Sequence, residues 1–328
     1  MRAWLIDGFS GIGGLRLAEV PEPAPQEHEA VLEVRYAALN PADRYLAEGQ
    51  YPARPPLPHI LGRDGLGTVV QVGPGVDGLK VGDRRVILRS DVGVNRAGTF
   101  AQRVSVPEAS LIEAPATWSE QEAAGATLVY LTAYQALTMW GPLPESAVVL
   151  VTGASGGVGV AAVQLGAALG CKVVGLSRSA DKGARLRRLG ATVTLNPEQP
   201  DWRAQLKGLL GSKRVDLAVD NIGGKLLPEV IDTLGELGRV SLVGRLAGPV
   251  PSFNTATLFF RRIRLGGVAV GANTVAESQA NWRHVLELLA RHDARPQVDR
   301  AFPFEQLPQA FERLAHGPMG KVLLAVGA

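Results

Sequence analysis

The fold of this chain is decided by the stretch Val148-Val149-Leu150-Val151-Thr152-Gly153-Ala154-Ser155-Gly156-Gly157-Val158-Gly159. An apolar strand enters a turn that contains Gly153, Gly156 and Gly159, and an apolar helix follows it. Glycines in such a turn allow a tight bend, close approach of a pyrophosphate, and close packing of the helix on the sheet. Because unpaired N–H groups at a helix N-terminus favour anions, we expect residues 153–159 to bind a dinucleotide.

Downstream of this turn, apolar strands alternate with amphipathic helices. Near-continuous apolar strands separated by helices predict a doubly wound parallel sheet that is covered on both faces, in an α/β protein. We expect strands at 148–152, 172–177, 193–195, 217–220, 240–243 and 265–270, and helices at 158–169, 180–189, 202–210, 226–234 and 281–290.

The second strand of this unit indicates which dinucleotide binds. An acidic residue about 20 residues beyond the glycine turn is typical of NAD sites, where it holds the ribose 2′-hydroxyl. This chain has Ser177 and Arg178 there instead, with Lys182 one turn later. These side chains suit a 2′-phosphate, so we expect NADP(H). The alternative is structural: Ser179 caps the next helix and Lys182 is a solvated residue of its first turn.

The first third of the chain is rich in Gly and Pro and carries short strand patterns at 30–36, 67–72 and 84–88. This pattern predicts a mostly antiparallel β domain with long loops. Ser119 and Glu122 have the spacing of a helix capping box, and one helix is expected from there to about Met139. The tail, residues 304–326, is expected to form a helix and a strand that return to the first domain.

Composition narrows the class of protein. The chain has 34 basic and 31 acidic residues without a long basic run, which argues against nucleic-acid binding. Cys171 is the single cysteine, so neither an intrachain disulfide nor a cysteine zinc cage can form. No uninterrupted apolar stretch is long enough to span a membrane. We expect a cytoplasmic protein without a targeting segment.

Several ordered motifs together resemble the medium-chain dehydrogenase/reductase superfamily, specifically its zinc-independent quinone oxidoreductase type. This resemblance implies a GroES-like, mostly-β catalytic domain at 1–118, a Rossmann NADP(H)-binding domain at 119–271, and a C-terminal segment at 272–328 that returns to the catalytic domain. The matching motifs are Ala38-Leu39-Asn40-Pro41-Ala42-Asp43-Arg44-Tyr45, Gly49-Gln50-Tyr51-Pro52, Leu61-Gly62-Arg63-Asp64-Gly65-Leu66-Gly67-Thr68-Val69, Val81-Gly82-Asp83-Arg84, Leu131-Thr132-Ala133-Tyr134, the glycine turn, Asp220-Asn221-Ile222-Gly223-Gly224 and Gly320-Lys321-Val322.

The resemblance also implies site residues. Asn40, Tyr45 and Tyr51 are expected to line the nicotinamide and substrate cleft, although a turn asparagine and two half-buried aromatics are the structural alternative. Asp64 stands where the family usually has Glu. Asn196 is followed by proline, where some relatives have a tyrosine that helps to bind the adenosine phosphate. Besides the glycine turn, Ser177, Arg178 and Lys182, the implied cofactor residues are Thr132, Asn221, Val243, Gly244 and Arg245.

A catalytic zinc site is not expected. In zinc-dependent relatives, a metal-ligand His stands at the position of Arg63, and the Cys ligand would fall at 37–40, which contains no Cys. His59 lies nearby, but a lone His is expected to be a packed or surface residue. We therefore assign no metal ligands.

The predicted function is NADPH-dependent reduction of a quinone or an α,β-unsaturated carbonyl compound without zinc. The proton donor stays open among Tyr51, Tyr45 and water. An enoyl-thioester or alkenal reductase of the same superfamily is the alternative within enzymes. A non-enzymatic NADPH-binding sensor or an RNA-binding protein is the alternative from another class. The apolar strand expected at 265–270 would be an exposed sheet edge, so we expect a homodimer in which it is covered by its own copy.

Overall fold

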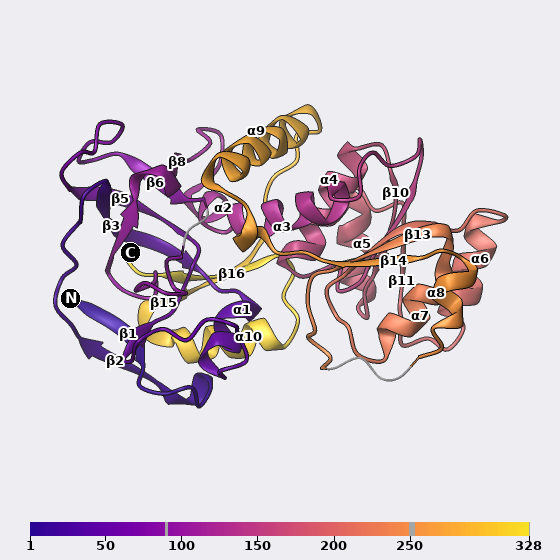
Figure 1. The fold of residues 1–328 in the computed structure, drawn as a ribbon, viewed down its shortest axis with the longest axis horizontal. Helices are drawn as coiled ribbons and strands as arrows, with labels where there is room; N and C mark the ends of the chain where they lie inside the picture. The colour runs from indigo at the N-terminus through magenta and orange to yellow at the C-terminus, as the bar shows by residue number, and fades with distance from the viewer. Residues whose placement is uncertain (89–90, 249–252, 328) are drawn as a thin grey trace. The chain divides into compact units, whose positions relative to one another are not determined.

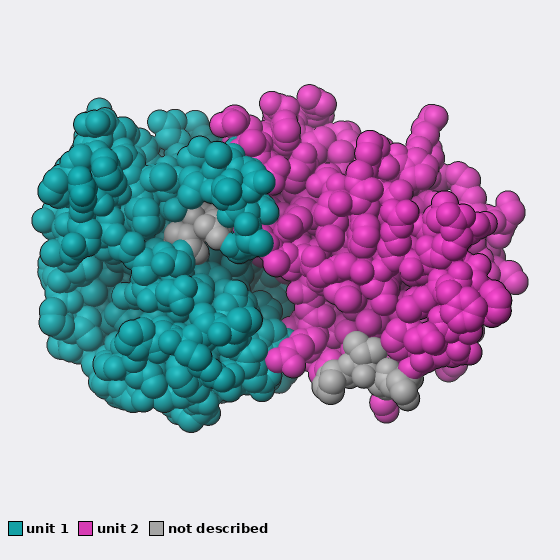
Figure 2. Space-filling model, in the orientation of Figure 1, with its two compact units in different colours: residues 1–128, 271–279, 295–328 teal, residues 129–270, 280–294 magenta. Residues whose placement is uncertain are grey.

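The computed structural model describes residues 1–88, 91–248 and 253–327, and the chain forms two compact units (Figure 2). Unit 1 comprises Met1–Leu128, Gly271–Gln279 and Arg295–Ala328, and unit 2 comprises Val129–Val270 and Ala280–Ala294. The expected domains were 1–118, 119–271 and 272–328. The units of the structure differ from them in two places: residues 119–128 belong to unit 1, and residues 280–294 belong to unit 2.

Unit 2 is built on a six-stranded parallel sheet (Figure 1), which confirms the predicted architecture. Its strand order, β11-β10-β9-β12-β13-β14, is the doubly wound order in which the direction of winding reverses between β9 and β12. Ligands of such sheets bind outside the carboxyl ends of the strands at this reversal. The strands are β9 (Val148–Val151), β10 (Lys172–Leu176), β11 (Val193–Leu195), β12 (Val215–Asp220), β13 (Leu234–Leu242) and β14 (Arg264–Gly267).

The helices expected at 158–169, 180–189, 202–210 and 226–234 begin and end within one residue of those limits. The helix expected at 281–290 begins earlier, at Val275, and the helix at Ala256–Phe260 was not expected. Strands β9, β10 and β12 are almost wholly buried because helices pack on the sheet. The last strand, expected to reach residue 270, ends at Gly267. The helices are α3 (Thr127–Thr138), α4 (Gly157–Ala168), α5 (Ala180–Arg188), α6 (Trp202–Leu210), α7 (Leu226–Thr233), α8 (Ala256–Phe260) and α9 (Val275–Arg291). The first residues of α3 and α9 belong to unit 1.

The prediction of a single helix from Ser119 to about Met139 is wrong, because two helices occupy this stretch. The capping box is present: the Glu122 N–H donates to Ser119 Oγ at 3.2 Å, and the Ser119 N–H donates to Glu122 Oε2 at 2.7 Å. The helix that it starts, α2 (Glu120–Ala124), ends at Gly125. A Cβ at Gly125 would lie 3.1 Å from the Lys321 side chain, so this close approach favours glycine where the first helix stops.

Unit 1 is mostly antiparallel β structure, as predicted. A seven-stranded sheet and a three-stranded sheet are accompanied by α1 (Pro41–Ala47), α2 and α10 (Leu307–Ala315). The larger sheet contains β3 (Glu29–Ala38), β5 (Gly65–Val72), β6 (Arg84–Ile87), β7 (Arg103–Pro107), β8 (Leu111–Glu113), β15 (Val298–Pro303) and β16 (Lys321–Ala325). The smaller contains β1 (Arg2–Ile6), β2 (Leu15–Glu19) and β4 (His59–Ile60).

The C-terminal strand returns to unit 1, as expected from its sequence. β16 pairs antiparallel with β3, with Leu323 opposite Ala38, and Figure 1 shows these two strands side by side. This pairing brings Lys321, at the start of β16, next to the end of β3, where Asn40 follows. Among the described residues, no helix is both long and apolar enough to cross a membrane.

Candidate active site and cofactor site

The glycine turn lies between β9 and α4, at the carboxyl edge of the unit 2 sheet. Gly153 has φ +56°, in the left-handed region that favours glycine. A Cβ at Gly159 would lie 2.3 Å from the Gly153 carbonyl oxygen, so only glycine lets α4 start this close to the turn. At Gly156 the nearest atom would be 3.5 Å away. The first N–H groups of α4 have no partner within the helix, which suits an anion such as a pyrophosphate.

The end of β12 lies beside this turn and carries a buried polar cluster. Thr152 Oγ1 donates to Asp220 Oδ1 at 2.7 Å and accepts the Asn221 N–H at 2.9 Å, while Asn221 Nδ2 donates to the Thr152 carbonyl at 2.7 Å. Burial raises the pKa of Asp220, and bonds from Thr152 and backbone amides oppose that effect. Asn221 Oδ1 is buried and has no hydrogen-bond partner among the described residues, so it can accept from a ligand.

The remaining predicted cofactor residues lie on neighbouring elements of unit 2. The N–H groups of Val243 and Gly244 both donate to the Asp220 carbonyl, at 2.9 and 3.2 Å, which places the segment after β13 next to Asn221. Arg245 follows on the exposed surface, and Thr132 lies half-buried in α3. Sequence reasoning missed Thr152 and Asp220 as the groups that orient Asn221.

The predicted 2′-phosphate residues follow β10. Ser177 Oγ donates to the Ser179 carbonyl at 3.3 Å, and Ser179 caps α5 by accepting the Lys182 N–H at 3.3 Å. Arg178 Nη1 lies 3.5 Å from Glu198 Oε1, and both side chains are about two-thirds exposed, at 69% and 65%. Glu198 follows β11 and was not foreseen; a carboxylate here opposes a bound phosphate.

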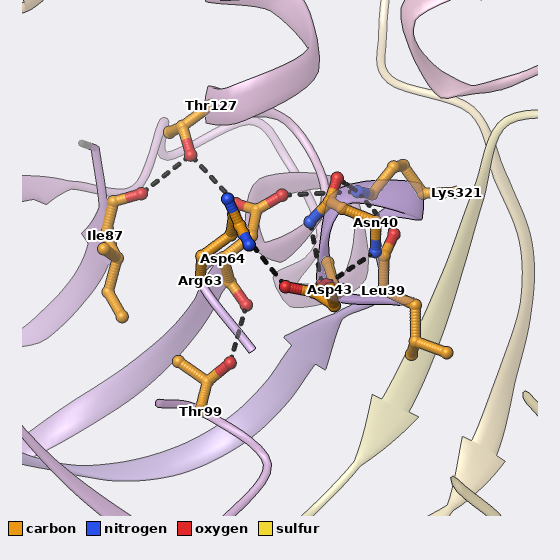
Figure 3. A network of polar contacts seen from close by, with 10 residues as sticks. Leu39, Asn40, Asp43, Arg63, Asp64, Ile87, Thr99, Thr127 and Lys321 are labelled. Carbon is orange, nitrogen blue, oxygen red and sulfur yellow. Dashed lines mark hydrogen bonds and ion pairs between the residues drawn. The ribbon is translucent and has the colours of Figure 1, made fainter. Parts of the chain in front are cut away.

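In unit 1, Asn40 sits between β3 and α1 and is only 4% exposed (Figure 3). Lys321 Nζ donates to Asn40 Oδ1 at 2.7 Å, to the Leu39 carbonyl at 3.0 Å and to Asp64 Oδ2 at 3.3 Å. Three acceptors match the three donors of an ammonium group. Asn40 Nδ2 donates to the Ala38 carbonyl at 3.1 Å, so the orientation of the Asn40 amide is fixed from both ends.

Asp64 is completely buried and is held by opposite charge and a hydroxyl group. Thr127 Oγ1 lies 3.0 Å from Asp64 Oδ1 and 2.7 Å from the Ile87 carbonyl (Figure 3). Burial raises the pKa of Asp64 and lowers the pKa of Lys321, while the attraction between the two groups opposes both effects. Asp64 is therefore part of a buried ion pair with Lys321, which also orients Asn40.

A second buried ion pair links Asn40 to Tyr51. Arg63 Nε donates to Asp43 Oδ1 at 2.9 Å, and Asp43 Oδ2 accepts the Asn40 N–H at 2.9 Å. The Arg63 guanidinium lies over the Tyr51 ring, with its carbon 4.8 Å from the ring centroid. Tyr45, on α1, is half-buried. Unit 1 thus connects Asn40 and Tyr51 through one chain of charged side chains.

The side chains that could ligate a metal are dispersed or already engaged. No three His, Cys, Asp or Glu side chains in the described parts of the chain are placed to share a metal ion. His59 is 4% exposed; burial lowers its pKa, and its Nε2 has no hydrogen-bond partner within the described residues. Cys171 is buried in unit 2.

Comparison with known proteins gives consistent matches over the whole chain. Residues 26–116 match the family described as alcohol dehydrogenase GroES-like domain, and residues 157–291 match the zinc-binding dehydrogenase family. Quinone oxidoreductase from Lama guanicoe is 31% identical over 327 residues, which cover 99% of this chain and 97% of that relative.

Solved structures agree with these matches. Escherichia coli quinone oxidoreductase complexed with NADPH has a TM-score of 0.89 and 26% identity, and the match covers 99% of this chain and 100% of that one. An NAD-dependent alcohol dehydrogenase has a TM-score of 0.91 and 31% identity, and the match covers 100% of both chains. The two structures differ in the nicotinamide cofactor that they name.

Proposed function

We propose that this chain, which belongs to the quinone oxidoreductase type of the medium-chain dehydrogenase/reductase superfamily, reduces quinones and α,β-unsaturated carbonyl compounds with NADPH. One observation carries the proposal. The polar centre of unit 1 contains two carboxylates, Asp43 and Asp64, each already neutralised by a buried cation, Arg63 or Lys321. Such a centre can orient and hydrogen-bond an acceptor, but it offers no free carboxylate to a metal.

The cofactor half of the proposal rests on unit 2. The glycine turn fits a pyrophosphate, and the unpaired Asn221 Oδ1 fits a hydroxyl or amide donor of the cofactor. Ser177, Arg178 and Lys182 favour a 2′-phosphate. When bound, NADPH supplies the hydride, and the protein contributes binding and orientation.

Zinc does not fit the residues present, although one matching family is described as zinc-binding. Arg63 is a buried cation at the position of a relative's His ligand, and its charge would repel a metal ion. His59 is packed in β4, and the single Cys belongs to unit 2. We therefore derive no step through zinc.

The chemistry of the acceptor follows from this. Without a Lewis acid, no group polarises an alcohol toward alkoxide at neutral pH. An acceptor that is already electrophilic needs only orientation and a hydrogen bond to the oxygen on which negative charge develops. We assign this role to the hydroxyl group of Tyr51 or Tyr45. The same requirements admit an enoyl-thioester or alkenal substrate as the alternative.

A panel of acceptors tests the proposal. The purified protein is mixed with NADPH or NADH and with 1,4-quinones, 2-enals, enoyl thioesters or simple ketones, and oxidation of the cofactor is followed. We expect rapid turnover with NADPH on quinones and enals, and none on simple ketones. Turnover that is fastest on enoyl thioesters would favour the alternative enzyme. Tight NADPH binding without turnover on any acceptor would favour the sensor, and RNA binding would favour an RNA-binding protein.

A further inference from the structure

Arg63 is positioned by a rigid segment of backbone. Gly62 precedes it with φ +97°, and a Cβ at Gly62 would lie 2.5 Å from Thr99 Oγ1 and 2.8 Å from a Phe100 ring carbon. The Thr99 N–H also donates to the Gly62 carbonyl at 2.8 Å. Position 62 therefore favours glycine, and a hydrogen bond from Thr99 holds the backbone that precedes Arg63.

The Arg63 guanidinium is held on its other side by α1. Nε donates to Asp43 Oδ1 at 2.9 Å and Nη2 donates to the Ala42 carbonyl at 3.2 Å, and the side chain is only 8% exposed. Burial alone would lower the pKa of Arg63, but attraction to Asp43 and Tyr51 and hydrogen bonds to both raise it overall. Arg63 is thus a permanent cation with little freedom to move.

Tyr51 is the aromatic group that this cation contacts. Its ring lies over the guanidinium at 4.8 Å, and the ring packs partly buried against the core of unit 1. A cation close to a phenol stabilises the phenolate more than the neutral form, because the phenolate carries a full negative charge.

From this geometry we propose that Arg63 is a positioning residue that makes Tyr51 the proton donor in acceptor reduction. This inference rests on the proposed function. In reduction of a 2-enal, hydride forms a C–H bond at the β carbon, and the π electrons move to the carbonyl oxygen. The Tyr51 Oη–H bond breaks, its proton passes to that oxygen, and the phenolate is stabilised by Arg63. The resulting enol tautomerises to the saturated aldehyde, and Tyr51 regains its proton from solvent, so that NADPH, the enal and H⁺ give NADP⁺ and the aldehyde.

A double-mutant cycle tests this coupling. Tyr51→Phe, Arg63→Gln and the double variant are compared with the parent enzyme for kcat and KM on a 2-enal. Losing a donor to a developing oxyanion costs on the order of a hundredfold in kcat, and we expect a loss of that order or less for Tyr51→Phe. We expect Arg63→Gln to lower kcat roughly three- to thirtyfold, the range of a desolvated cation–π contact.

The decisive result is non-additivity. If Arg63 acts through Tyr51, the double variant is no slower than Tyr51→Phe alone, and KM for NADPH is unchanged in all variants. Tyr45→Phe should lower kcat less than Tyr51→Phe does, because the Tyr51 hydroxyl is the group that delivers the proton. Independent, multiplying losses from Arg63→Gln and Tyr51→Phe would overturn the inference, as would a larger loss from Tyr45→Phe than from Tyr51→Phe.

Folding is controlled separately, because Arg63→Gln leaves the buried Asp43 without its partner. Arg63→Lys keeps the charge and should recover part of kcat, and Asp43→Asn combined with Arg63→Gln keeps the buried pair neutral. If the protein with Asp43→Asn and Arg63→Gln folds and has the kcat of the parent enzyme, Arg63 does not act through Tyr51. If none of the acceptors supports NADPH oxidation by the parent enzyme, the proposed function fails as well. If the parent enzyme turns over and the variants have the same kcat as the parent, only this inference is overturned.

Discussion

Replacing Glu198 by Gln should increase the affinity for NADPH and leave the affinity for NADH nearly unchanged. The Glu198 carboxylate pairs with Arg178, the residue that we propose binds the 2′-phosphate, with 3.5 Å between Nη1 and Oε1. If Arg178 binds the 2′-phosphate, NADPH has to displace this carboxylate or bring its phosphate next to it. NADH carries no 2′-phosphate, so it gains nothing from the substitution.

The size of the effect follows from the distance and the exposure. Two unit charges 3.5 Å apart attract by about 1.2 kcal/mol in bulk water. Both side chains are about two-thirds exposed, and pairs of this kind contribute about 0.2–1 kcal/mol when measured. We therefore expect the Kd for NADPH to fall roughly 1.4- to fivefold. The gain should shrink as salt is raised, because exposed charges are screened.

The assay is titration of each variant with NADPH and NADH at low and high salt. Glu236→Gln is the matched control: Glu236 also pairs with an arginine, at 3.8 Å and 70% exposure, but near the start of β13, away from the carboxyl edge of the sheet. Arg178→Ala should weaken NADPH by about 1–3 kcal/mol, the scale of a charged hydrogen bond. Equal gains for NADPH and NADH in Glu198→Gln, or equal binding of both cofactors by the parent protein, would refute the phosphate site.

Four further predictions concern the fold and the assembly. Gly159→Ala should lower the Tm, because its Cβ would lie 2.3 Å from a backbone oxygen. Gly156→Ala, whose Cβ would lie 3.5 Å from the nearest atom, should keep the Tm and weaken NADPH binding. Equal losses of Tm in the two variants would contradict this. Lys321→Met should destabilise the protein by about 3–5 kcal/mol in chemical denaturation by leaving the buried Asp64 unpaired, and Asp64→Asn in the same chain should recover most of it. The purified protein should contain no stoichiometric zinc and EDTA should not slow quinone reduction, while activity that appears only with added zinc would overturn this expectation. Among the described strands, β14 pairs only with β13, and its Leu265 is 37% exposed. Light scattering should therefore give the mass of a dimer at micromolar concentration for the parent protein and the mass of a monomer for Leu265→Arg. A monomeric parent protein would count against the dimer.

Much of the fold could be predicted because local patterns determine it. The apolar runs of β9, β10 and β12 and the glycine turn follow directly from residue type and spacing. The break at Gly125 could not be predicted, since it depends on contact with Lys321, which lies far away in the sequence. β15 was missed for a similar reason: Val298–Pro303 contains charged residues and a proline, and it becomes a strand by pairing with β16.

The candidate site was only partly predictable. Motifs pointed to Asn40, Tyr51 and Asn221, but the groups that hold them come from distant parts of the chain. Lys321 donates a hydrogen bond to Asn40, which lies 281 residues earlier in the sequence. The Gly320-Lys321-Val322 motif was part of the family resemblance, but it did not indicate that Lys321 orients Asn40. Glu198 carries no motif at all, and only the adjacency of the β10 and β11 ends brings it to Arg178.

Isotope transfer from NADPH in the absence of metal tests the proposed reaction most directly. The protein, freed of metal by chelation and checked for zinc content, is given NADPH deuterated at the transferred C4 position together with a 2-enal. We predict that NADPH is consumed and that the deuterium is found on the β carbon of the product, at a rate that added zinc does not change. Product without deuterium, or turnover that appears only after zinc is restored, would contradict it.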